Sequence, residues 1–247
     1  MIKVIQEQNS FPGVTNKILA TKAKKICVAY DKMEAFFPAD KIVITGNPVR
    51  QDVWNIQGKR ERAMVHFGLD ANKPVVLIIG GSLGARTINQ SIEKHAEAIV
   101  QSGAQLLWQT GKNFQSAKHQ NSAAIKIHTF IKEMDLAYAS ADIIISRAGA
   151  MSISELCLIK KPCILVPSPN VAEDHQTKNA MALVNKNAAI LIRDAEAIDK
   201  LGKETIHLLS DTNKQKELSA EIAKLGKPNA DIDIVSQIFN IVQPANT

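Results

Sequence analysis

A run of small and polar residues, Ser146 to Glu155, has the composition of a ligand-binding turn. It follows an apolar run, Ala141 to Ile145, which predicts a buried parallel strand. It leads into Ile153 to Leu158, which predicts a helix with Glu155 on its first turn. Backbone N–H groups at a helix start bind charged or carbonyl oxygens, and a carboxylate can bind paired ribose hydroxyls. The segment therefore predicts one wall of a nucleotide-sugar site.

Glu155 also has a purely structural interpretation. Ser152 to Glu155 fit the capping box S-x-x-E, in which the Glu only accepts a hydrogen bond from a backbone donor. The two interpretations are equally good on these residues alone. The turn after a buried strand favours ligand binding, because ligands lie outside the carboxyl ends of parallel strands.

A second Gly-rich turn follows the apolar run Val75 to Ile79 and spans Gly80 to Ala85. A strand, a Gly-rich turn and a helix start together predict a phosphate cradle. Neither the P-loop spacing nor the G-x-G-x-x-G dinucleotide fingerprint fits this turn. A tight turn capped by Ser82 is the equally good structural alternative.

Two further segments carry candidates for the same cleft. Read in isolation, Asp174 is expected to cap the next helix and to leave Gln176 in solvent. That loop also leaves a strand's carboxyl end, so Gln176 is a candidate for binding sugar hydroxyls beside Glu155. Asn9 follows the first predicted strand, and Arg50 either stacks on a base or lies in solvent.

Composition limits the partners. A formal net charge of +6 suits anionic ligands such as phosphates, or an anionic membrane surface. Only 4% of the residues are aromatic and the lysines are scattered, so no nucleic-acid partner is expected. No His, Cys or carboxylate cluster has metal-ligand spacing, so no metal is expected. The cysteines are expected to be reduced core residues of a cytoplasmic protein: Cys27, Cys157 and Cys163.

Apolar strand-like runs alternate with helix-like segments, which predicts an α/β protein with a doubly wound parallel sheet. The predicted strands cover residues 3–6, 25–29, 41–45, 75–79, 105–109, 125–129, 143–146, 163–166 and 189–192. The predicted helices cover residues 13–21, 85–102, 134–139, 154–159, 176–186, 195–210, 213–225 and 231–242.

The predicted strands divide at a linker around Gly46 to Arg50. Residues 49–230 are expected to form one complete Rossmann-like domain with a six-stranded unit. Residues 1–48 are expected to be the end fragment of a second domain, with too few strands for a sheet of their own. Residues 231–247 predict a C-terminal helix that packs back on the 1–48 fragment.

In this order and spacing, the motifs Gln6–Asn9, Gly46–Arg50, Gly80–Ala85, Ser146–Glu155 and Asp174–Ala180 resemble the MurG family of peptidoglycan glycosyltransferases. The resemblance implies the GT-B architecture of two Rossmann-like domains. It also implies transfer, with inversion, of N-acetylglucosamine from UDP-N-acetylglucosamine to the 4-hydroxyl of undecaprenyl-linked muramyl-pentapeptide. No cofactor beyond this donor substrate is implied.

The resemblance assigns a role to particular positions. Glu155 would hold the ribose, and Gln176 would bind the hydroxyls of N-acetylglucosamine. Ser82 would bind the diphosphate, and Ile131 would offer backbone groups to the uracil. The other residues implied at the donor site are Asn9, Arg50, Ala150, Met151, Ser152, Ile153 and Ser154.

The chain begins at what resembles the last third of the family's N-terminal domain, which holds the acceptor site and the candidate general base. We therefore expect no catalytic residue in this chain and little or no transfer by it alone. The family's peripheral association with the inner face of the cell membrane is expected to come from that absent part. Two alternatives stay open: a non-catalytic nucleotide-sugar binding module, and a GT-B sugar-nucleotide 2-epimerase.

Overall fold

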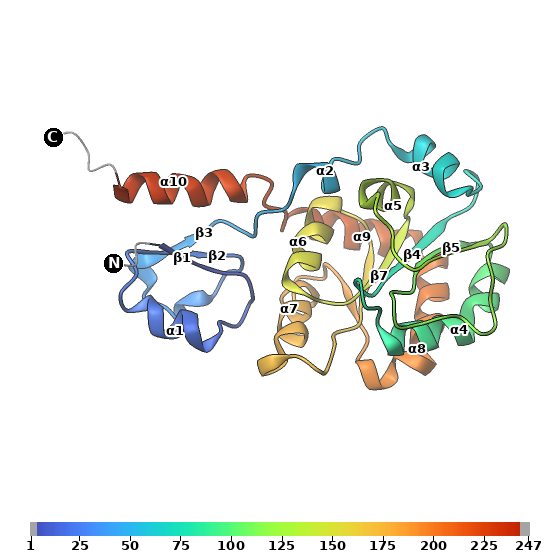
Figure 1. Ribbon diagram of the computed structural model, residues 1–247, viewed down its shortest axis with the longest axis horizontal. Helices are drawn as coiled ribbons and strands as arrows, with labels where there is room; N and C mark the ends of the chain where they lie inside the picture. Colours follow the sequence, from blue (N-terminus) through green and yellow to red (C-terminus); the bar gives the residue numbers. More distant parts are fainter. Residues whose placement is uncertain (1–3, 243–247) are drawn as a thin grey trace.

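The computed structural model describes residues 4–242, and these form two parallel sheets with helices packed around them (Figure 1). The predicted first strand included Lys3, and the predicted last segment included residues 243–247, all of which lie outside the described residues. The α/β class and the GT-B type of parallel sheet are confirmed.

The larger sheet has six parallel strands in the order β6-β5-β4-β7-β8-β9. Because the chain starts in the middle and winds first to one side and then to the other, β4 and β7 lie side by side where the strand order reverses. Parallel sheets open a crevice at that point, outside the carboxyl ends of the two strands. The strands are β4 (Val75–Ile79), β5 (Gln105–Gln109), β6 (Ile125–His128), β7 (Ile143–Ser146), β8 (Cys163–Leu165) and β9 (Ile190–Leu191).

Helices cover both faces of this sheet, as its continuous apolar strands require. Alternate residues of β4 point to opposite faces: Leu77 packs with α3, α5, α6 and α7, whereas Ile78 packs with α4 and α8. The helices of the larger part are α2 (Gln51–Trp54), α3 (Arg60–Phe67), α4 (Arg86–Gln101), α5 (Met134–Ser140), α6 (Ala150–Ile159), α7 (His175–Val184), α8 (Asp194–Ser210) and α9 (Thr212–Ala223).

The smaller sheet corrects one expectation. The first three strands were expected to be too few for a sheet, yet they pair in parallel in the order β1-β2-β3. Ile5, Ile26 and Val28 form a small core with Met33 and Phe37. The elements are β1 (Val4–Glu7), α1 (Val14–Ala20), β2 (Lys25–Val28), β3 (Ile42–Ile44) and the 3₁₀ turns η1 (Met33–Ala35) and η2 (Ala39–Lys41).

The last helix, α10 (Ala230–Val242), extends from the larger part toward the side on which the small sheet lies (Figure 1). Its buried end is near the linker, because a Cβ added at Gly46 would meet Lys227 and Ala230. Its apolar side chains, from Ile232 to Val242, are largely exposed. The packing of this helix on residues 1–48 therefore stays a prediction. No helix within residues 4–242 is long and apolar enough to cross a membrane.

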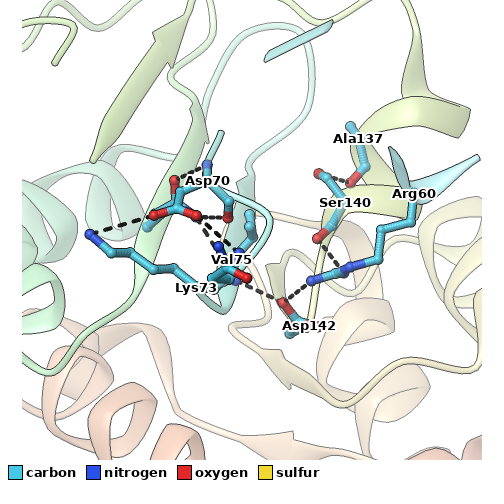
Figure 2. Close-up of polar contacts among 9 residues, drawn as sticks. Arg60, Asp70, Lys73, Val75, Ala137, Ser140 and Asp142 are labelled. Carbon is cyan, nitrogen blue, oxygen red and sulfur yellow. Dashed lines mark hydrogen bonds and ion pairs between the residues drawn. The ribbon is translucent and has the colours of Figure 1, made fainter. Parts of the chain in front are cut away.

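A polar network fixes α3 at the amino ends of β4 and β7, opposite the crevice (Figure 2). Arg60 donates to the Ser140 carbonyl oxygen at 2.8 Å and to Asp142 Oδ2 at 2.9 Å. The same Asp142 oxygen accepts from the Val75 backbone nitrogen at 2.8 Å. This network anchors the far end of the two central strands and leaves their carboxyl ends to the site. The sequence analysis missed α3 itself, because its first three residues are charged and its apolar pattern is weak.

Candidate functional site

A cavity of about 350 Å³ opens at the carboxyl ends of β4, β5 and β7. It therefore lies at the reversal of strand order, where a doubly wound sheet binds ligands. Five of the predicted site residues line it: Ser82, Ile131, Ser152, Glu155 and Gln176. The other lining residues are Ile79, Gly80, Gly81, Gln109, Phe130, Met134, Tyr138, Ser146, Arg147 and Gly149.

The Gly80 turn forms one wall and is closely packed behind. A Cβ at Gly84 would lie 2.1 Å from the Thr110 carbonyl oxygen, and Gly84 has a φ of +86°, so only glycine fits. Helix α4 begins at Arg86 with Ala85 at its N-cap, so the alternative in which Ser82 caps this helix is wrong. Ser82 is instead exposed on the turn and lines the cavity.

Helix α6 forms the facing wall, and it starts earlier than predicted. Its first residue is Ala150, with Gly149 at the N-cap and no side-chain capping bond from the residues described. Glu155 is therefore on the second turn and not on the first, and the capping-box alternative is wrong. The small residues from Ala150 onward are helical, and only residues 147–149 separate the helix from the end of β7.

Glu155 is held by Tyr138 from the neighbouring helix α5. The Tyr138 hydroxyl donates to Glu155 Oε2 at 2.7 Å. Burial raises the pKa of Glu155, while the hydrogen bond from Tyr138 and the positive charge of Arg50 lower it in part. The other carboxylate oxygen, Oε1, makes no hydrogen bond within residues 4–242, so the carboxylate retains an acceptor for a ligand's hydroxyl groups.

Gln109, at the end of β5, fixes the loop that contains Ile131. Its Oε1 accepts from the Ile131 backbone nitrogen at 2.8 Å, and its Nε2 donates to the Gly81 carbonyl oxygen at 3.2 Å. The Ile131 N–H is thus already used within the protein. Its carbonyl oxygen is the backbone group of Ile131 left for a base.

Gln176, on the first turn of α7, is fixed in a similar way. Its Oε1 accepts from the backbone nitrogens of Ser168 at 2.9 Å and Ala148 at 3.2 Å. Its Nε2 makes no hydrogen bond within residues 4–242 and is therefore the donor that a ligand would meet. Asp174 occupies the N-cap position of α7 but accepts no capping bond from the described residues, so the alternative in which Asp174 caps this helix and leaves Gln176 in solvent is wrong.

Asn9 lies at the junction of the two sheets. Its Oδ1 accepts from Asn179 Nδ2 of α7 at 3.0 Å, and the same nitrogen reaches the Ala148 carbonyl oxygen at 3.3 Å. Asn179 Oδ1 accepts from the Ser10 backbone nitrogen at 2.9 Å. The junction therefore brings Asn9 next to the turn that precedes α6, although Asn9 does not line the cavity itself.

The remaining predicted residues are placed elsewhere. Arg50 is on the surface, with 80% of its side chain exposed. Ser154 accepts a hydrogen bond from Asn47 Nδ2 at 3.0 Å, and together with Ile153 it lines a different cavity. Neither Ala150 nor Met151 lines the site cavity.

Two polar residues of the site were missed by sequence reasoning, Gln109 and Tyr138, whereas Arg147 lies within the predicted segment Ser146 to Glu155 but was given no role. Gln109 ends a predicted strand, so its position at the carboxyl edge was a usable signal. Tyr138 gave no signal, because its role depends on how α5 packs beside α6. Arg147 donates to the carbonyl oxygens of Val166 and Pro167 and to Asp194, which joins the loops after β7 and β8 to the start of α8.

Comparison with known proteins shows which family the chain resembles in sequence. The family described as "Glycosyltransferase family 28 C-terminal domain" matches residues 75–234. A protein of Flavobacterium psychrophilum named UDP-N-acetylglucosamine–N-acetylmuramyl-(pentapeptide) pyrophosphoryl-undecaprenol N-acetylglucosamine transferase is 52% identical over 97% of this chain and 66% of its own length. A protein of the same name from Phocaeicola vulgatus is 54% identical over 96% of this chain and 65% of its own length. The chain therefore spans just under two thirds of these relatives.

Solved structures agree. The crystal structure of MurG from Acinetobacter baumannii is 26% identical, with a TM-score of 0.75 over 96% of this chain and 66% of its own. A structure described as a putative UDP-N-acetylglucosamine 2-epimerase from Listeria monocytogenes has a TM-score of 0.65 at 14% identity, which shows a shared fold alone. The resemblance to MurG drawn from the motifs is confirmed. The chain belongs to glycosyltransferase family 28 and contains that family's C-terminal domain.

Proposed function

We propose that this chain is the donor-binding part of an inverting N-acetylglucosaminyltransferase, and that its site cavity binds UDP-N-acetylglucosamine. One observation carries the proposal: five predicted residues line a single cavity where the strand order of the sheet reverses. They are Ser82, Ile131, Ser152, Glu155 and Gln176. These residues come from four separate elements or loops, and each has a free group suited to a different part of a nucleotide sugar.

The diphosphate would lie between the Gly80 turn and the start of α6. Both sites precede helices, whose first backbone N–H groups have no partner within the helix and whose dipoles favour negative charge. Charge grows on the leaving diphosphate when the sugar is transferred. Preorganised N–H donors stabilise such charge, and the loss of one oxyanion-type donor costs about 3 kcal/mol.

The nucleoside and the sugar would be bound by further groups at the cavity. Glu155, with a free carboxylate oxygen, would accept from the ribose hydroxyls, and the Ile131 carbonyl oxygen would accept from the uracil. The Gln176 amide nitrogen would donate to a hydroxyl of N-acetylglucosamine. Asn9 would approach the sugar from the side of the small sheet, where Asn179 holds it.

The acceptor in the proposed reaction is the 4-hydroxyl of lipid-linked muramyl-pentapeptide, as in the reaction for which the relatives are named. The ionisable side chains that line the cavity are Glu155, Tyr138 and Arg147, and all three are held by contacts within the protein. We therefore place the general base on the acceptor side and expect no transfer by residues 1–247 alone. We also propose that association with the membrane surface belongs to the acceptor side.

Calorimetry with three nucleotide sugars tests the proposal. UDP-N-acetylglucosamine should bind more tightly than UDP-glucose or UDP-N-acetylgalactosamine. Gln176→Glu should remove this preference while UDP itself still binds, because the carboxylate still accepts from Ser168 and Ala148 but has no amide N–H to donate to the sugar. Equal binding of all three sugars to a folded sample, judged by circular dichroism, would contradict the proposed donor.

A further inference from the structure

A second cavity, of about 220 Å³, lies between the small sheet and the larger part of the chain. Ile44 and Gly46, from β3 and the linker, contribute one side of it. Ile153 of α6 and Leu183 of α7 contribute the other side. The site cavity at the carboxyl ends of β4, β5 and β7 is called the donor cavity from here on. No residue within the described range lines both cavities. We call the second cavity the junction cavity.

Helix α6 separates the two cavities. Ser152 and Glu155 face the donor cavity, whereas Ile153, Ser154 and Cys157 face the junction cavity. Positions three apart share a helix face and adjacent positions do not, so the two sets lie on different faces of one helix. A ligand in the junction cavity would therefore contact α6 from behind the donor site.

The rim of the junction cavity is basic. Lys186, Lys224 and Lys227 line it, with Asp31 as the one acidic residue among the lining residues. Lys186 pairs with Asp31 at 2.7 Å, and Lys224 pairs with Glu221 at 2.6 Å. Both ion pairs are exposed, and exposed ion pairs contribute little to stability. An incoming anion can therefore displace the carboxylates of Asp31 and Glu221 from the lysines at a low cost in free energy. Lys227 makes no ion pair within residues 4–242.

The inner wall is apolar, apart from a buried hydroxyl. The buried Ile153 and Leu183 provide its aliphatic surface, and the more exposed Ile44 and Leu225 extend it. Tyr30 also lines the cavity, and its hydroxyl is buried with no hydrogen-bond partner among the described residues. A buried polar atom without a hydrogen-bond partner costs free energy, so this hydroxyl is available for a hydrogen bond to a ligand.

We propose that the junction cavity binds a small amphiphilic anion, with an aromatic or aliphatic body against the inner wall and a phosphate or carboxylate at the three lysines. The division of the lining into an apolar wall and a basic rim indicates this class of ligand, and the volume, below that of a typical drug-sized site, limits the ligand to a small one. Because both parts of the chain contribute walls, the bound ligand holds the small sheet against α6 and α7. It thereby stabilises the arrangement in which Asn9 meets Asn179.

Phenyl phosphate is a suitable probe, because it combines a ring with a dianion, and methyl NMR locates it. Titration of the full chain should shift the methyl signals of Ile44, Ile153 and Leu183 with saturation. The signals of Ile79 and Ile131 in the donor cavity should stay in place. Amide exchange across residues 44–50 should slow at saturation, because the linker is then held from both sides.

Two variants test the basic rim and the apolar wall separately. Lys224→Gln combined with Lys227→Gln should weaken binding by about tenfold, whereas the charge-matched pair Lys118→Gln and Lys203→Gln, at exposed positions that do not line the cavity, should leave it unchanged. Ala182→Phe should fill the cavity and abolish the methyl shifts, with folding checked by circular dichroism.

Three results would overturn the proposal. One is the absence of saturable shifts with phenyl phosphate. Another is shifts confined to Ile79 and Ile131, which would place the probe in the donor cavity. The third is inorganic phosphate alone producing the same shifts at the same concentration, because the apolar wall would then have no role. None of these outcomes would contradict UDP binding in the donor cavity, which calorimetry tests separately.

Discussion

The Tyr138 hydroxyl donates a 2.7 Å hydrogen bond to Glu155, and this contact joins α5 to α6 across the wall of the donor cavity. Burial favours the neutral form of Glu155, whereas the hydrogen bond favours the carboxylate that ribose binding needs. Tyr138 therefore acts on the proposed ligand through Glu155.

The Tyr138–Glu155 contact predicts a pH effect on binding. Because burial raises the pKa of Glu155, UDP affinity should fall as the pH drops through a range above that of an ordinary Glu. Tyr138→Phe removes a contact that lowers this pKa, so the midpoint should move to still higher pH. UDP affinity measured by calorimetry across pH checks this, with Glu155→Gln as the control that lacks the protein's own transition. An unchanged midpoint in Tyr138→Phe would contradict the assignment.

Glu155 also predicts a trade-off between stability and binding. Its pKa is raised in the folded state, so its stabilising effect is present below the ordinary Glu range and is lost as the pH rises through the folded pKa. Glu155→Gln should therefore raise the free energy of unfolding near pH 8, by on the order of 1 kcal/mol, and the gain should disappear in acid. Urea unfolding at both pH values measures it. A variant that is less stable at pH 8 would count against a costly buried carboxylate.

Two glycines of the Gly80 turn form a matched pair. Gly81 has a φ of +80° and open space around its missing Cβ, so Gly81→Ala should cost about 1 kcal/mol from backbone strain alone. Gly84→Ala adds a clash with the Thr110 carbonyl oxygen, so it should cost about 2 to 4 kcal/mol. Urea unfolding compares the two variants, and equal losses would show that the turn is not packed against Thr110 as described.

Asn179 should control how the small sheet is held. Its side chain bonds to Asn9, to Ser10 and to the Ala148 carbonyl oxygen, and it is buried. Asn179→Ala leaves these partners unpaired and should cost about 1 to 3 kcal/mol, with faster amide exchange in β1. Lys186→Ala, which removes an exposed ion pair at the same junction, should cost less than about 1 kcal/mol. Similar exchange in the two variants would contradict a specific role for Asn179.

Much of the fold could be predicted from the sequence. The apolar runs of β4, β5 and β7 are continuous because both faces of their sheet are buried, and their predicted bounds agree with the structure. Helix α3 was missed because charged residues mask its buried face. The small sheet was missed because an expectation about the number of strands could not foresee the core of Ile5, Ile26 and Phe37.

The site residues that could be predicted are those that follow directly after predicted strands. Glu155, Gln176 and Ser82 follow strands whose carboxyl ends meet, so pattern alone brought them together. Tyr138 and the Gln109 contact to Ile131 depend on packing between elements, which no local pattern encodes. Ile153 and Ser154 are within the predicted motif, yet helix α6 turns them toward the junction cavity, because consecutive helical residues point in different directions.

UDP titration by calorimetry, on the wild-type chain and on Glu155→Ala, tests the central claim most directly. We predict saturable binding of UDP to the wild type and a loss of about tenfold or more in Glu155→Ala, since each tenfold step corresponds to about 1.4 kcal/mol. Arg62→Ala, on the exposed surface of α3, should bind as the wild type does. A folded chain that does not bind UDP, or that binds it equally well without the Glu155 carboxylate, would contradict the proposal that the donor cavity binds the nucleotide sugar.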